Sequence, residues 1–210
     1  MPRVADSESP RRWSPEVDED KERVYVVRPR TVKNLTSAST RFSLHRESTR
    51  LKLREEVVRF AYHLAIVSLT RVEGVVVSPA PSDHGIDLLV TASPSAPGRI
   101  FGVEVKGATA GRLVNREGIV REDIAQRVRH YARDMAFPVG VMICEMPTDM
   151  AYFGWVLSPH PTHGSKAPQS LTLVSRIRVA LATKRIMSRA IKDVNAWYDQ
   201  VMKSRQLQPS

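Results

Sequence analysis

Two short apolar stretches of this chain carry ionisable side chains where a buried strand would normally have none. Residues 85–90 contain Asp87, and residues 101–106 contain Glu104 and Lys106. On a strand, Glu104 and Lys106 leave the same face because they are two residues apart. A turn rich in Pro, Gly and Ser joins the stretches, so we expect them to pair as a hairpin and to gather these charges. Buried charges are costly unless they pair or hold a metal ion, so the cluster indicates either a functional site or an ion pair on a half-exposed strand.

These residues resemble the active site of the PD-(D/E)xK nuclease superfamily, which has the restriction-endonuclease-like fold. Residues 87–89 (Asp-Leu-Leu) and 104–106 (Glu-Val-Lys) are most similar to Mrr-type restriction enzymes and archaeal Holliday-junction resolvases. The resemblance covers roughly residues 50–157 and implies an α/β fold, with a mixed central sheet flanked by helices and an αβββαβ core. The chain departs from the pattern twice: no proline directly precedes Asp87, and Gly107 follows the lysine where a small hydroxyl residue is common.

The resemblance implies a divalent cation, Mg²⁺ or Mn²⁺, at the cluster. Such a hard cation prefers carboxylate, carbonyl and water oxygens, so Asp87, Glu104 and the backbone carbonyl of Val105 are the expected ligands. The bound ion would polarise a scissile phosphate and acidify a water molecule. Lys106 would orient or deprotonate that water, or stabilise negative charge in the transition state. A lysine between two carboxylates should stay charged, which favours the stabilising role.

A helix expected over residues 47–68 offers a further carboxylate. Its apolar residues fall on one stripe at 3.6-residue spacing. Glu56 lies at the edge of that stripe, whereas Glu55 lies on the opposite face. Related nucleases bring a helix glutamate to the metal, so Glu56 is the better candidate, and a solvated glutamate is the equally simple alternative.

Polar residues on two later helices are candidates for contacts with nucleic acid. In a helix expected near residues 121–135, Gln126 lies off the apolar stripe and could meet the active site, as polar residues do in some relatives. In a second helix, expected over 184–201, three basic residues share one sector and could follow a phosphate backbone or simply face solvent. They are Arg185, Arg189 and Lys192.

The remaining pattern divides the chain into three parts. Residues 1–40 have the mixed charge of a flexible arm, residues 41–160 form the nuclease-like core, and residues 161–210 form a basic extension that ends in a helix. The order of expected elements in the core is a helix, three strands, a helix and two strands. This order matches the core of the restriction-endonuclease-like fold.

Charge and composition favour a DNA-binding protein. The net charge is +10, of which residues 31–60 supply +4 and residues 161–210 supply +7, whereas residues 61–160 sum to −1. Basic flanks around a near-neutral core are the expected footprint of phosphate binding. The single cysteine excludes an internal disulfide and a thiolate zinc site. Without a signal peptide or a membrane-length apolar run, we expect a cytoplasmic protein with no membrane partner.

The leading hypothesis from the sequence is a metal-dependent endonuclease that hydrolyses DNA phosphodiester bonds. The resemblance implies a role in restriction, in defence against foreign DNA or in DNA processing on a mobile element. Separate recognition or motor subunits are possible partners, and cutting both strands with one site per chain would favour a homodimer. The alternative is a non-catalytic nucleic-acid-binding or assembly subunit that keeps the nuclease fold. An RNA substrate ranks lower because no aromatic-rich sheet surface is evident.

Overall fold

A computed structural model describes residues 40–81, 85–93, 95–109, 113–160 and 170–206 of the chain. The predicted arm, apart from its last residue, lies outside the described residues, and α1 is described from Thr40, with its side chains from residue 51. The helices are α1 (Thr40–Thr70), α2 (Glu122–Ala132), the short 3-10 helix η1 (Met146–Thr148) and α3 (Lys184–Gln206). The strands are β1 (Val76–Pro79), β2 (Leu88–Thr91), β3 (Ile100–Ala108), β4 (Val139–Glu145), β5 (Met150–Ser158), β6 (Thr172–Leu173) and β7 (Ala180–Leu181).

Within the described residues, the seven strands form one mixed sheet. Its order is β1-β2-β3-β4-β5-β6, and β7 also pairs with β5. Strands β3 and β4 are parallel and joined through α2, whereas the other pairs are antiparallel. The predicted class, an α/β fold with a mixed sheet flanked by helices, is therefore confirmed. The order from α1 to β5 is also the order that the sequence predicted.

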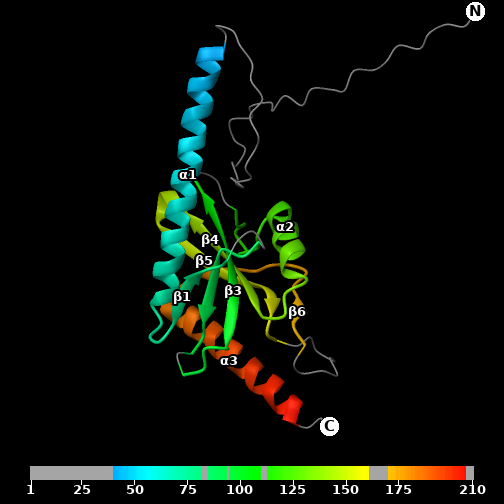
Figure 1. The fold of residues 1–210 in the computed structure, drawn as a ribbon. Helices are drawn as coiled ribbons and strands as arrows, with labels where there is room; N and C mark the ends of the chain where they lie inside the picture. The colour runs from blue at the N-terminus through cyan, green and yellow to red at the C-terminus, as the bar shows by residue number, and fades with distance from the viewer. Residues whose placement is uncertain (1–39, 82–84, 94, 110–112, 161–169, 207–210) are drawn as a thin grey trace, which may run out of the picture.

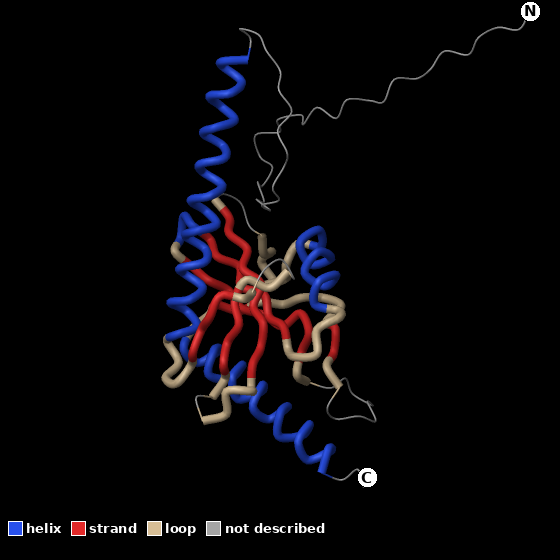
Figure 2. Tube along the Cα trace, viewed as in Figure 1, coloured by secondary structure: helices blue, strands red, loops and turns tan. Residues whose placement is uncertain are grey.

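The helices lie on opposite sides of the sheet (Figures 1 and 2). Helices α1 and α3 pack with Phe101 and Val103 of β3 in one apolar cluster. Helix α2 packs with Val141 and Ile143 of β4 in a second cluster. We call these the α1/α3 side and the α2 side. Because side chains alternate along a strand, Glu104 and Lys106 leave β3 on the α2 side.

The central strands are buried on both faces. Every residue of β4 before Glu145 is buried, which is typical of a strand covered by helices on both sides. Cys144 lies in this strand on the α1/α3 side, and its Sγ donates a hydrogen bond to the Ala61 carbonyl at 3.4 Å. Burial raises the pKa of this thiol to about 12. This cysteine is therefore a residue of the apolar core.

The C-terminal part of the chain completes the sheet and one of its layers. Strands β6 and β7 pair with β5, and α3 contributes Met187, Ala190 and Val194 to the cluster on the α1/α3 side. Residues 172–206 thus share the sheet and core of the segment predicted to be the nuclease-like core. No described helix has both the length and the apolar character needed to cross a membrane.

Candidate active site

Asp87 lies one residue before β2, at the point where pairing between β2 and β3 ends. The last paired residues are Leu88 and Val103. The Asp87 N–H donates to the Val103 carbonyl at 3.0 Å, and the Val105 N–H donates to Oδ2 of Asp87 at 2.6 Å. The aspartate is thereby bonded to both chain neighbours of Glu104. These bonds hold Asp87 beside Glu104, although Asp87 itself is exposed.

Glu104 and Lys106 form an ion pair on the α2 side of β3. The Lys106 Nζ contacts Oε1 of Glu104. Only 4% of Glu104 is exposed, and the lysine side chain is 15% exposed. Glu104 is the single acidic or basic residue among the buried residues that the structure describes. The sequence pattern therefore located a charge pair that is largely withdrawn from solvent.

The electrostatic environment of Glu104 is unfavourable for its charge. Burial raises the pKa of the Glu104 carboxyl above its ordinary value, because loss of hydration penalises the charged form. The Lys106 ammonium opposes this effect, the Asp87 carboxylate adds to it, and Arg127 weakly opposes it. The two carboxylates are thus close enough to repel each other. A cation bound between them would relieve that repulsion.

Gly85 fixes the path of the chain into Asp87. Its φ is +74°, a left-handed conformation that other residues rarely adopt. A Cβ at this position would lie 2.3 Å from Cγ of Tyr131 on α2, far closer than side chains pack. Only glycine fits at this turn, and its contact with α2 sets the position of the segment that carries Asp87.

Gly107 is one of the two positions where the chain departs from the PD-(D/E)xK pattern, and its contact with α1 explains the glycine. A Cβ on Gly107 would lie 2.8 Å from Cγ1 of Val57 and 2.9 Å from Cβ of Ala61. Helix α1 therefore packs directly on the β3 backbone just after Lys106. A hydroxyl side chain at this position would push the helix away from the sheet.

The donor groups at the cluster fit a hard divalent cation. Asp87 and Glu104 supply carboxylate oxygens. The N–H of Val105 points toward Asp87, and in an extended residue the carbonyl points to the same side as the N–H. The Val105 carbonyl therefore faces the edge where Asp87 lies. Two carboxylates and one carbonyl suit Mg²⁺, which keeps several water ligands. No group of three or more His, Cys, Asp or Glu side chains suited to a metal occurs in the described part of the chain.

Glu56, the predicted helix carboxylate, does not join this cluster. It is exposed on α1. Its neighbour Val57 contacts Gly107 from the α1/α3 side, whereas the Glu104 side chain lies on the α2 side. The sheet separates the two glutamates. The helical pattern predicted this helix and the burial of Val57 and Ala61, but Val67 of the predicted stripe is exposed. Helical spacing also does not reveal which face of the sheet the helix covers.

Helix α2 brings a different residue to the cluster from the one that the sequence favoured. Gln126 is exposed, whereas the neighbouring Arg127 is half-buried and acts on the charge of Glu104. Arg127 also donates from Nε to the Asp123 carbonyl at 3.1 Å, which steadies its side chain. A helical wheel could have found this residue: at 100° per residue, Arg127 lies 60° from Ile124, and Gln126 lies on the far side.

The basic residues predicted on α3 lie in the other layer of the molecule. All three are exposed, on a helix whose buried face packs on the α1/α3 side. The structure therefore does not bring them to the cluster around Glu104. The three residues are Arg185, Arg189 and Lys192.

No protein-family model, curated protein or solved structure matches the chain, so these comparisons do not identify it as a PD-(D/E)xK nuclease.

Proposed function

We propose that this protein is a divalent-metal-dependent nuclease that hydrolyses phosphodiester bonds of DNA. The observation that carries the proposal is the buried Glu104 carboxylate, which lies beside the carboxylate of Asp87 and an ion-paired lysine. A structural ion pair has no need for a second carboxylate that raises the pKa of the first. A site that receives a cation accounts for this arrangement.

In this proposal, each residue of the cluster has a role that follows from its chemistry. Asp87, Glu104 and the Val105 carbonyl would hold Mg²⁺ or Mn²⁺, which when bound polarises the scissile phosphate and acidifies a water molecule. Lys106 would stabilise the negative charge that develops on the phosphate, because its ammonium is held within the cluster by Glu104. Arg127 would add positive charge from α2.

Cleavage of DNA by the purified protein tests the proposal. We expect plasmid and linear DNA to be cut with Mg²⁺ or Mn²⁺ and to stay intact with EDTA. Lys106→Ala should abolish cutting while the circular dichroism spectrum and melting curve remain those of a folded protein. Lys203→Ala is the matched control, because this exposed lysine lies in the last turn of α3, and it should cut normally. Equal cleavage by the two variants would disprove the assignment.

The alternative function is a nucleic-acid-binding subunit without catalysis. It is favoured by the exposed basic residues of α3, which lie in the layer opposite the cluster. In that case DNA would bind with a strong dependence on salt concentration, but no cutting would follow with any divalent cation. Binding and cleavage measured on the same preparation separate the two functions.

A further inference from the structure

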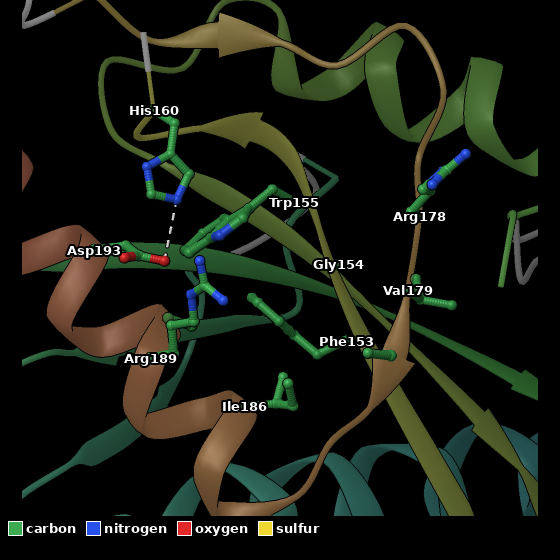
Figure 3. A pocket seen from close by; sticks show the side chains of 11 residues that line it. Phe153, Gly154, Trp155, His160, Arg178, Val179, Ile186, Arg189 and Asp193 are labelled. Atoms are coloured by element: carbon green, nitrogen blue, oxygen red, sulfur yellow. Dashed lines mark ion pairs between the residues drawn. The ribbon is translucent and has the colours of Figure 1, made fainter.

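A hollow of about 290 Å³ opens on the α1/α3 side, away from the Glu104 cluster. It is lined by β5, by the segment that leads into β7, and by α3, with His160 just beyond the end of β5 (Figure 3). Its volume is near the lower bound of small-molecule pockets, about 300 Å³. The hollow therefore suits a ligand the size of a single nucleotide rather than a larger cofactor.

An aromatic side chain in the hollow is held rigidly but only partly buried. The ring of Trp155 packs edge-to-face with Phe153 and Phe101, with centroids 5.1 and 5.7 Å apart. Among the described residues, no acceptor receives a hydrogen bond from its indole N–H. Buried tryptophans usually find an acceptor. A fixed ring that is partly exposed in the hollow is well suited to stacking on a planar ligand.

Among the described residues around the hollow, the guanidinium of Arg189 has no partner. Arg189 and Asp193 are four residues apart on α3, a spacing at which opposite charges commonly pair. Instead, Oδ2 of Asp193 pairs with Nε2 of His160 at 3.1 Å (Figure 3). Within the described part of the chain, Arg189 forms no ion pair or hydrogen bond. Arg178 also lines the hollow, but in Figure 3 its side chain is directed away from Trp155.

We propose that this hollow binds a nucleotide, with the base stacked on Trp155 and the phosphate held by Arg189 beside His160. A guanidinium binds phosphate oxygens through two parallel hydrogen bonds. Any nucleic-acid base can stack on an aromatic side chain. Phosphate alone would leave the aromatic surface unused, and an uncharged aromatic compound would leave the arginine unused. The nucleotide is either free in solution or part of a nucleic-acid strand.

Calorimetric titration with 5′-dAMP, deoxyadenosine and inorganic phosphate tests the proposal. We expect dAMP to bind more tightly than either fragment, and Arg189→Gln to weaken dAMP binding by about tenfold while leaving deoxyadenosine binding unchanged. Arg185→Gln is the matched control, because this exposed arginine lies one turn away and does not line the hollow. Equal losses in the two variants, or no dAMP binding by the wild-type protein, would overturn the proposal.

Variants of the aromatic residue test the stacking separately. Trp155→Leu should weaken dAMP binding by about tenfold, whereas Trp155→Phe should retain most of it. Unchanged binding by the leucine variant would overturn the role of the ring. If the leucine variant fails to fold, the comparison of Arg189→Gln with Arg185→Gln still tests the site. Competition by a 5′-phosphorylated oligonucleotide would support a strand as the source of the nucleotide, and its absence would support a free nucleotide. Binding should persist in Glu104→Gln, so the result does not depend on whether the protein cuts DNA.

Discussion

The two sides of the sheet are both well packed, but they treat charge in opposite ways. On the α1/α3 side, the buried residues of the cluster are apolar, and a cysteine is the most polar of them. On the α2 side, the same strand β3 buries Glu104 and pairs it with Lys106. Burial of a charge costs free energy that apolar packing does not. The comparison teaches that one side supplies stability, whereas the other side gives some of it up, a cost that the proposed catalytic role would explain.

The largest effect should follow from removing the buried charge. Glu104→Gln should reduce cleavage about a thousandfold or more, because the proposed metal ion would lose a ligand. In the absence of metal, the same variant should melt at a higher temperature than the wild-type protein at pH 7, because burial disfavours the charged form. Glu117→Gln, on an exposed residue, should change neither property.

The direction of the pKa shift of Glu104 determines how this difference in stability depends on pH. Because the folded-state pKa of Glu104 is raised, the destabilisation is complete above that pKa and disappears as the pH falls to the unfolded-state pKa. The advantage of the Glu104→Gln variant should therefore shrink as the pH falls through the folded-state pKa. Urea unfolding at several pH values measures this difference. An advantage that grows toward acid pH would contradict the assigned sign.

A cavity introduced on the α1/α3 side should lower the stability of the protein without changing cleavage. Met187 is fully buried on α3, so Met187→Ala should lower the free energy of unfolding by about 3 kcal/mol. Cleavage per folded molecule should stay the same, because the residue lies across the sheet from Glu104. Met202→Ala is the control on the same helix, where the side chain is 52% exposed, and it should leave stability nearly unchanged. Loss of cleavage without loss of stability in Met187→Ala would show that the two sides are coupled.

Gly85→Ala should lower both the stability of the protein and its cleavage activity. The added Cβ meets Tyr131 and the backbone has a positive φ, so we expect a loss of about 2 kcal/mol in unfolding free energy. Cleavage should fall as well, because the turn sets the position of Asp87. At Gly98 nothing lies within 4 Å of an added Cβ, so Gly98→Ala should be tolerated. Stability and cleavage assays on both variants would show whether the contact with α2 positions the aspartate.

The smallest effect should come from Arg127. Its charge lowers the pKa of Glu104, so Arg127→Gln should raise that pKa further. The acid limb of the pH profile for cleavage should then move to higher pH, with a rate loss below about tenfold at neutral pH. Arg133→Gln, on an exposed residue that follows the same helix, is the control. A shift of the acid limb toward lower pH would contradict the assigned role.

Much of this organisation could be predicted because strands have a two-residue period. The charges at Glu104 and Lys106 interrupt an apolar strand on one face only, which determines their common side. The element order from α1 to β5 followed from the same apolar patterns. Asp87 was expected within a strand but precedes β2, because the turn at Gly85 and the pairing of its carboxylate with Val105 are not visible in the pattern.

Other features depend on contacts between segments far apart in the sequence. Helical spacing predicted α1 and only part of its buried stripe, and it did not predict the face of the sheet that the helix covers. The position of Glu56 relative to the cluster was therefore not predictable. The hollow at Trp155 is built from β5, β7 and α3, and the two-residue strand β7 is too short to produce a recognisable pattern. The sequence spacing suggests that Arg189 pairs with Asp193, and only the structure shows that Asp193 pairs with His160 and that Arg189 has no partner among the described residues.

The single cysteine gives this molecule a built-in reporter. Cys144 lies beneath α1, and its thiol, with a pKa near 12, is almost entirely protonated at neutral pH. Because the thiolate is the reactive form, an alkylating reagent should modify it only when the helix detaches from the sheet. The alkylation rate would therefore measure how often that layer opens, without any engineered label.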